Sequence, residues 1–93
     1  PNVITRAMQH GKPVITSNIG AMQSIIDHNT NGMLVAPGDV EQLKNAIENL
    51  YKDAKKCIRL GAQGKKKALQ DYNDMEIYKS LINTYTYALN TKK

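Results

Sequence analysis

The sequence contains no tryptophan and no phenylalanine, so its five tyrosines are its only aromatic residues. It has a single cysteine, Cys57, which cannot form a disulfide within the chain. No apolar run is long enough for a transmembrane helix. These absences exclude a disulfide-stapled fold and a membrane-spanning segment. They predict a small domain with a packed core, and we expect a cytoplasmic protein. A single cysteine indicates a reducing compartment or carries no information about the compartment.

Basic residues outnumber acidic ones by 13 to 8, which gives a net charge of +5. Such a balance can indicate binding to nucleic acid or to an anionic membrane surface. The tyrosines, however, gather near the end of the chain and do not alternate with the lysines as a base-stacking surface requires. We therefore expect a solvated helix face, no nucleic-acid partner, and at most peripheral contact with the inner face of a membrane. Much of the excess charge lies in Lys55, Lys56, Arg59, Lys65, Lys66, Lys67, Lys92 and Lys93.

The spacing of apolar residues predicts helices that alternate with short strands. Turn residues such as Asn, Gly and Pro bound the predicted elements. We expect a helix over 2–9, a strand over 13–16, a short helix within 21–27, a strand over 33–35, a helix opened by Asp39, one or two helices over 54–70, a break at 72–74 and a final helix.

The first predicted helix has an apolar face formed by Val3, Ile4, Ala7 and Met8. Gly11 follows it and can take the left-handed conformation that commonly ends a helix. Further along, Asn31-Gly32 forms an Asn-Gly pair, which tolerates positive φ at little cost. The chain therefore has clear stop signals between its elements.

The helix opened by Asp39 has capping-box spacing, with Gln42 at the third position. Its apolar residues repeat at three and four positions, as expected for a core-facing helix. These residues are Val40, Leu43, Ile47 and Leu50.

The last third of the chain is harder to interpret. Gly61 and Gly64 each cost up to about 1 kcal/mol inside a helix, so the segment 54–70 is predicted to be weakly helical. Asn73 and Glu76 again have capping-box spacing and predict a new helix after a break. Its apolar face would consist of Ile77, Leu81, Tyr85 and Leu89.

Strands separated by helices pair in parallel with right-handed crossovers, so the fold class is α/β with helices on both faces of a parallel sheet. Two strands are too few for a doubly covered sheet. We therefore expect residues 1–93 to be the C-terminal half of one domain, with its remaining strands before Pro1.

The segment 1–17, Pro-Asn-Val-Ile-Thr-Arg-Ala-Met-Gln-His-Gly-Lys-Pro-Val-Ile-Thr-Ser, resembles a hallmark segment of the retaining GT-B-fold glycosyltransferases. That family commonly has Pro-Asn-Val, two residues, Glu-Ala-Met-Ala, one residue, and Gly-Lys-Pro-Val-Ile-Ala-Ser. The similarity continues through 18–20, 25–26, 31–35, 37–39 and 60–61, and to the boundary at 72–73, where the family commonly has Phe-Ser before its last helix. It therefore covers nearly the whole chain.

The resemblance implies a Rossmann-like nucleotide-sugar-binding domain in an enzyme that transfers a sugar from a nucleoside diphosphate donor with retention of configuration. It implies that Asn2, Val3 and Arg6 lie on the diphosphate and ribose side of the donor. The start of a helix suits a diphosphate because its N–H groups are unpaired and its dipole end is positive. An ordinary solvated helix start is the alternative for these residues.

The sequence departs from the family pattern at Arg6, where similar proteins have the glutamate that accepts hydrogen bonds from the ribose hydroxyls. A guanidinium only donates, so Arg6 could pair with a phosphate or could mark an atypical site. The earlier glutamate of the family pattern would precede Pro1. We therefore expect no catalytic residue in this chain and no activity from it alone.

Other reactive residue types lack the partners that chemistry would need. His10, His28 and Cys57 have no metal-ligand spacing, and neither Ser17 nor Ser24 has a matching His and Asp. We expect no metal and no cofactor. By resemblance the partners are a nucleotide-sugar donor and a sugar, lipid or protein acceptor held by a separate N-terminal domain.

Two other functions remain open from the sequence. One is a non-catalytic domain that binds a nucleotide sugar, which Arg6 would favour. The other is a basic module that binds nucleic acid or a membrane surface, whose binding would depend steeply on salt.

Overall fold

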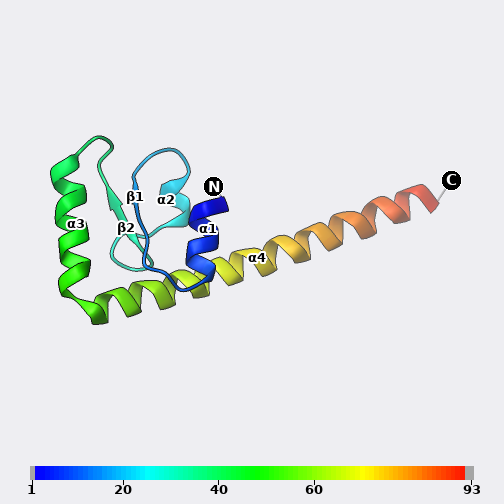
Figure 1. Cartoon of the computed structure of the whole chain (residues 1–93). Coiled ribbons are helices and arrows are strands. Elements are labelled where there is room, and N and C mark those ends of the chain that lie inside the picture. The colour runs from blue at the N-terminus through cyan, green and yellow to red at the C-terminus, as the bar shows by residue number, and fades with distance from the viewer. Residues whose placement is uncertain (1, 92–93) are drawn as a thin grey trace.

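The computed structural model describes the backbone of residues 2–91 and the side chains of residues 3–82. Helices and strands alternate and then give way to two long helices (Figure 1). The order of the elements confirms the α/β class. The elements are α1 (Asn2–Gln9), β1 (Ile15–Ser17), α2 (Met22–Ile25), β2 (Met33–Val35), α3 (Val40–Lys52) and α4 (Ala54–Thr91).

The two strands are parallel, with Ile15 opposite Met33 and Ser17 opposite Val35. The strand predicted over 13–16 therefore begins two residues later. Val14 already takes part in the pairing, since its carbonyl accepts a hydrogen bond of 2.8 Å from the N–H of Met33. Pro13, which has no N–H, stays outside the strand.

One face of the sheet packs against α3 and the first part of α4. Met33 and Val35 turn their side chains to this face and are buried with Ala46, Leu50 and Leu60. Leu60 is fully shielded from solvent. This cluster joins the two strands to both long helices.

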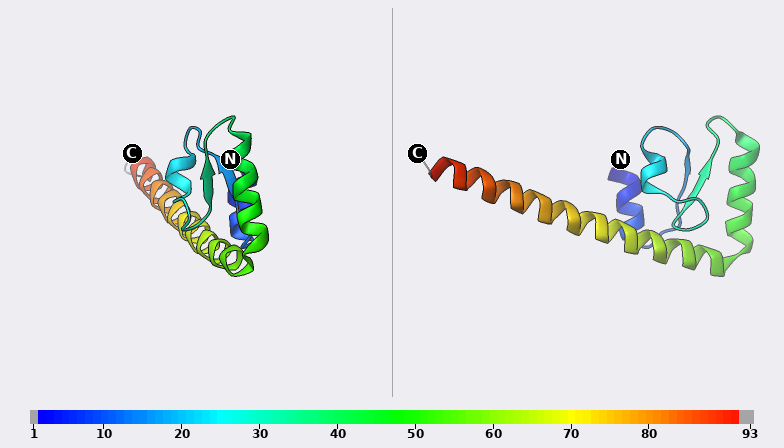
Figure 2. Two further views of the ribbon diagram at one scale, coloured as in Figure 1. Left: turned by 90° about the vertical axis from the view of Figure 1, so that its left-hand side faces the viewer. Right: turned by 180° about the vertical axis from the view of Figure 1, so that it is seen from behind.

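The other face packs against α1, α2 and a later part of α4. Val14 is buried there with Met8, Ile26 and Ala68. Because successive strand residues point to opposite faces, the adjacent residues Val14 and Ile15 serve the two different clusters. The predicted arrangement of helices on both faces of a parallel sheet is confirmed, as two further views show (Figure 2).

α1 ends as predicted, because Gly11 has a φ of 71° and its N–H bonds the carbonyl of Met8 at 2.9 Å. The predicted apolar face of this helix is partly wrong. Met8 is buried and Ile4 and Ala7 pack beside it, but the Val3 side chain is 78% exposed. Val3 lies on the outward side of the helix.

The turn before β2 has its left-handed residue at another position than predicted. The Asn31-Gly32 pair predicted positive φ at that pair. Asn29 has a φ of 64°, whereas Gly32 has no positive φ. The Asn31 side chain is buried and its Oδ1 accepts a 2.8 Å hydrogen bond from the N–H of Asp27. Gly32 is needed for space, since a Cβ there would lie 3.1 Å from the Ile26 side chain.

Only half of the predicted capping box forms at the start of α3. The Asp39 carboxylate accepts a 2.9 Å hydrogen bond from the N–H of Gln42. The Gln42 side chain does not return to Asp39, because its Oε1 accepts from the N–H of Ala36. The N–H of Asp39 bonds the carbonyl of Ala36 at 3.2 Å. Gln42 thus ties the helix to the end of β2.

The predicted core face of α3 is only partly correct. Leu50 is buried, together with Ala46, but Val40 and Ile47 are 74% and 52% exposed. The helix presents its Ala46 side to the sheet. An apolar stripe of Val40, Leu43 and Ile47 therefore faces outward.

The predicted break at 72–74 is wrong, since α4 runs without interruption for 38 residues (Figure 1). Asn73 and Glu76 have capping-box spacing, but no glycine or proline after Gly64 forces the helix to end. The described apolar residues of the expected face, Ile77 and Leu81, are exposed. Tyr85 and Leu89 of that face lie outside the described side chains.

The helix glycines that predicted a weak segment are explained by close contacts. A Cβ on Gly61 would overlap the carbonyl oxygen of Gly11, and one on Gly64 would lie 3.0 Å from the carbonyl oxygen of Asn31. The two glycines let the turn after α1 and the turn before β2 rest directly on α4. Their role is packing.

Asp39→Ala is expected to destabilise the fold by about 1 kcal/mol, because it removes the side chain that caps α3. Urea unfolding followed by circular dichroism would measure the change. Asp39→Asn is the matched control, since the amide oxygen can still accept from the N–H of Gln42. Equal stabilities of the Ala and Asn variants would contradict the capping role.

Candidate functional site

The carboxyl ends of both strands and the start of α1 lie at the same end of the molecule (Figures 1 and 2). The segment 18–21 leaves β1 there, and the segment 36–39 leaves β2 beside it. In open α/β sheets, ligands bind at the carboxyl ends of the strands, next to helix N-termini. This end is therefore the first place to look for a site.

A small hollow of about 100 Å³ opens directly at the two strand ends. It lies between the ends of the strands and the start of α3, where Asp39 caps the helix. Its lining residues are Ser17, Val35, Ala36, Gly38, Asp39, Val40 and Leu43. Its volume suits part of a ligand at most.

A larger hollow of about 400 Å³ runs along the outward face of α1 and is lined by Val3, Arg6, Ala7 and His10. Intervals of three, four and seven residues from Val3 place these side chains on one face of a helix. Two of the residues expected at a donor site, Val3 and Arg6, thus share one surface. His10, which the sequence analysis did not select as a site residue, lines the same hollow, as its spacing of four from Arg6 allows.

The Arg6 side chain is exposed, and no described residue offers it a hydrogen bond or an ion pair. Its five N–H donors are therefore available to a ligand. The backbone of Asn2 begins α1, but the side chain of this third expected site residue lies outside the described part of the chain.

The other reactive side chains have structural partners. His28 Nδ1 accepts a 2.9 Å hydrogen bond from the N–H of Leu34, and the Cys57 thiol donates to the Leu50 carbonyl at 3.1 Å. Ser24 donates to the carbonyl of Ala21. Within residues 3–82, no three His, Cys, Asp or Glu side chains are grouped so that they could hold a metal ion.

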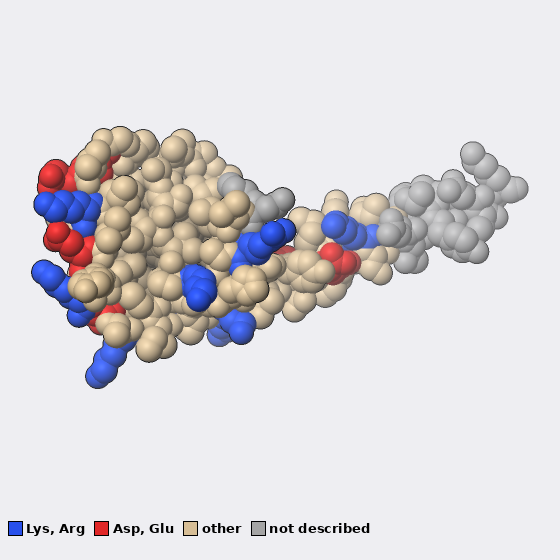
Figure 3. All heavy atoms as spheres, viewed as in Figure 1, with Lys and Arg blue, Asp and Glu red and all other residues tan. Residues whose placement is uncertain are grey.

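Several basic side chains of α4 are anchored to the rest of the fold. Lys56 Nζ donates to Asn49 Oδ1 at 2.8 Å, Arg59 donates to the carbonyl of Asn29 at 3.0 Å, and Lys67 donates to the carbonyl of Ser24 at 3.0 Å. On the face shown in Figure 3, uncharged surface separates the basic groups, and acidic groups lie among those near α3. These side chains anchor α4, and the basic groups on this face do not form one continuous patch.

None of the helices in the described part of the chain is both long enough and apolar enough to cross a lipid bilayer.

Residues 1–67 match the model of the family described as glycosyl transferases group 1. An uncharacterized glycosyltransferase of Methanocaldococcus jannaschii is 28% identical over 94% of this chain and 22% of its own length. A GDP-mannose-dependent phosphatidylinositol monomannoside mannosyltransferase of Mycobacterium tuberculosis is 30% identical over 68% of this chain and 16% of its own.

A solved structure is similar to this chain over most of its length. HepE of Anabaena, in complex with UDP-glucose, is similar with a TM-score of 0.82 and 28% identity, over 92% of this chain and 24% of HepE. The chain therefore spans less than a quarter of the length of each of these relatives.

Proposed function

The chain belongs to the glycosyl transferases group 1 family, and we propose that it forms part of the donor site of an enzyme that transfers a sugar from a nucleoside diphosphate sugar. The fold is similar to part of the GT-B glycosyltransferases, and in this proposal that part belongs to their nucleotide-binding domain. The observation that carries the proposal is the shared hollow of Val3, Arg6, Ala7 and His10 along α1, whose first turn lies at the end of the sheet where ligands bind.

In this proposal the residues of the chain bind and orient the donor. The first N–H groups of α1 have no partner within the helix and face the diphosphate. Arg6, which no described residue engages, lies on the ribose and phosphate side, and Val3, Ala7 and His10 line the same hollow. The positive end of the helix dipole supplies the potential that a diphosphate requires, so we propose that no metal is needed.

We also propose that the chain is the latter part of a larger nucleotide-binding domain. The pairing of Val14 and Asn18 with β2 leaves the N–H of Ile15 on the outer edge of β1, where no described residue bonds it. An open edge of this kind accepts another parallel strand. The exposed stripe of Val40 and Ile47 is a second surface that a larger domain would cover.

The reacting groups and the acceptor then lie outside this chain. We propose retention of configuration, a sugar, lipid or protein acceptor bound by a separate domain, and no glycosyl transfer by the isolated chain. A half-buried free thiol at Cys57 suits the cytoplasm. The exposed lysines that remain, such as Lys66, are compatible with peripheral contact at the inner face of a membrane.

Titration of the isotopically labelled chain with UDP should shift the backbone amide signals of residues 3–10 and 17–20 and leave those of α3 unchanged. The reason is that the diphosphate contacts the start of α1 and the strand ends. Uridine, which has no phosphate, serves as the control and should shift these signals much less.

Shifts of equal size with uridine and UDP, or shifts confined to α4, would contradict the placement of the site. Turnover of a nucleotide sugar by the isolated chain would contradict the assignment of the reacting groups to another part of the enzyme. A steep loss of UDP binding with salt and equal binding of RNA would favour a basic module, which the anchored side chains of Lys56, Arg59 and Lys67 do not support.

A further inference from the structure

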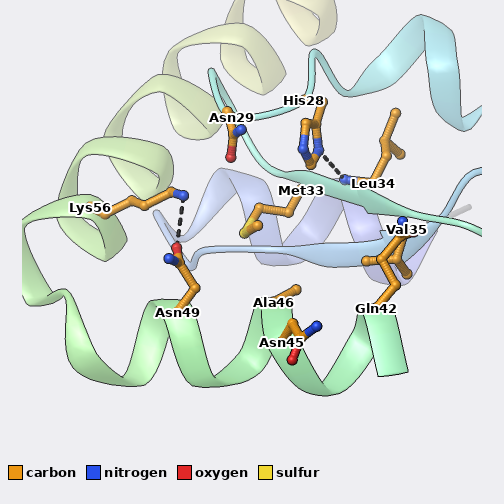
Figure 4. A pocket seen from close by; sticks show the side chains of 10 residues that line it. All are labelled: His28, Asn29, Met33, Leu34, Val35, Gln42, Asn45, Ala46, Asn49 and Lys56. Carbon is orange, nitrogen blue, oxygen red and sulfur yellow. Dashed lines mark hydrogen bonds between the residues drawn. The ribbon is translucent and has the colours of Figure 1, made fainter. Parts of the chain in front are cut away.

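A polar groove lies on the other side of the sheet from α1, between α3, the start of α4 and the turn at His28 and Asn29 (Figure 4). Its volume is about 280 Å³. The floor is formed by Met33, Val35 and Ala46, all of which are buried. Polar side chains stand around this apolar floor: His28, Asn29, Gln42, Asn45, Asn49 and Lys56.

The polar groups of the groove have hydrogen-bond donors left over. Lys56 donates one of its three N–H groups to Asn49 Oδ1 and keeps the other two. The N–H₂ group of the Asn49 amide makes no hydrogen bond with a described residue. His28 accepts at Nδ1 from Leu34, so the neutral ring carries its proton on Nε2. Asn45 makes no hydrogen bond with any described residue, and its amide can both donate and accept.

The charge of the groove has one sign. Lys56 is partly buried, and its ammonium group gives the groove a positive charge. No carboxylate is among the residues that line the groove. Arg59 adds a second cation nearby, where it holds the carbonyl of Asn29. An ammonium with unused donors attracts an oxyanion, whereas amide side chains match hydroxyl groups, which also donate and accept.

We propose that this groove is a second ligand site that takes a small, hydroxylated anion of the size of one sugar, such as a sugar phosphate or a sugar carboxylate. Its volume lies just below the range of roughly 300–1,000 Å³ that is usual for ligand pockets, and so is too small for a whole nucleotide sugar. The oxyanion lies at Lys56 and Asn49, and the hydroxyl groups lie along Asn45 and His28.

This site is independent of the proposed donor site. The groove lies on the face of the sheet covered by α3, whereas the hollow of Val3 and Arg6 lies on α1, which covers the opposite face. The two sets of lining residues have no member in common. A ligand in the groove can therefore be bound together with a donor.

The test is an NMR titration of the 93-residue chain with glucose 6-phosphate, read at the side-chain amides of Asn45 and Asn49 and at the backbone amide of Lys56. We expect saturable shifts at these positions. Glucose and inorganic phosphate should each bind about tenfold more weakly, because each lacks one half of the matching chemistry. Glucuronate distinguishes a carboxylate from a phosphate as the bound oxyanion, and binding of either supports the site.

Lys56→Gln should weaken glucose 6-phosphate about tenfold, because it removes the charge-assisted hydrogen bond. Lys55→Gln is the matched control, since it makes the same change one residue away on an exposed side chain, and it should bind as the unchanged chain does. Asn45→Asp, at an exposed position with no hydrogen bond to lose, should abolish binding by placing a carboxylate in the groove.

Three results would overturn the proposal. One is the absence of saturation by glucose 6-phosphate or glucuronate, and another is equal effects of Lys55→Gln and Lys56→Gln. The third is displacement of glucose 6-phosphate by UDP, which would assign the binding to the donor site. Failure of UDP to shift α1, with the groove still saturable, would remove the proposed donor function and leave this inference standing.

Discussion

Gly61→Ala is expected to destabilise the fold by about 3 kcal/mol, at the upper end of the range for overpacking. The added Cβ would overlap the carbonyl oxygen of Gly11 and lie 3.0 Å from its carbonyl carbon. Both are backbone atoms of the turn that caps α1, so no side-chain rotation can relieve the contact. The turn and α1 would have to move away from α4, the helix against which α1 packs.

The sign of this change separates packing from local helix preference. Alanine favours a helix interior by up to about 1 kcal/mol over glycine, so a helix without this contact would gain stability. Urea unfolding measures the net change, and amide hydrogen exchange at Met8 reports whether α1 has separated from α4. We expect faster hydrogen exchange at the Met8 amide in the Gly61→Ala variant.

Two variants on the same helix serve as controls. Gln63→Ala, at an exposed position, should change stability very little. Gly64→Ala should have a smaller effect than Gly61→Ala, because its Cβ would lie 3.0 Å from the carbonyl oxygen of Asn31, a tight contact that a small shift relieves. A Gly61→Ala variant as stable as the unchanged chain would show that α1 does not rest on α4 in this way.

Arg6→Glu is expected to strengthen nucleoside diphosphate binding by about 10- to 100-fold in the enzyme to which we propose this chain belongs. A carboxylate accepts from both ribose hydroxyls, and a hydrogen bond to a charged group contributes about 1.5–3 kcal/mol. Arg6 has no partner among the described residues, so its removal breaks no contact of the fold. Calorimetric titration with UDP and GDP would measure the change.

Arg6→Ala and Lys12→Glu are the controls for this prediction. Arg6→Ala should leave binding weak, since it supplies no acceptor. Lys12→Glu makes the same change of charge at an exposed position outside the hollow and should not strengthen binding. Weaker binding in both Arg6 variants, more so with Glu, would mean that Arg6 holds the diphosphate. Unchanged affinity in both would place Arg6 away from the nucleotide.

Much of the fold could be predicted from the sequence because local signals and tertiary packing agree in the first half of the chain. The helix over 2–9, the cap at Gly11 and the strand over 33–35 were predicted correctly. Asp39 caps α3 as its position indicated. Each of these features depends on interactions within a few residues, which spacing and residue type reveal.

The errors have two causes, one in the local sequence and one in contacts with distant residues. Asn73 and Glu76 have the spacing of a helix start, yet α4 continues through them, because a capping pair permits a start without forcing the preceding helix to end. Val40 and Ile47 have helical spacing, yet the sheet lies against Ala46 and Leu50. Apolar spacing shows that a helix is amphipathic and does not show which part of a wide apolar face meets the core.

The candidate sites also include residues that the sequence could select and residues that it could not. The residues 1–17 sufficed to indicate the glycosyltransferase resemblance and to select Val3 and Arg6, because these signals are local in sequence. The groove around Lys56 required the tertiary structure, because its lining comes from segments far apart in the chain.

By itself, the sequence determined the α/β class, the family, and the presence and order of the early elements. The reason is that hydrogen bonds over three or four residues and apolar periodicity both depend on neighbouring positions. The tertiary structure decided why Gly61 and Gly64 are glycines, where Lys56 and Arg59 place their charges, and which residues line each hollow. These depend on contacts between segments far apart in the chain, such as Gly11 with Gly61 and Asn29 with Arg59. Local spacing carries no information about which distant segments will meet.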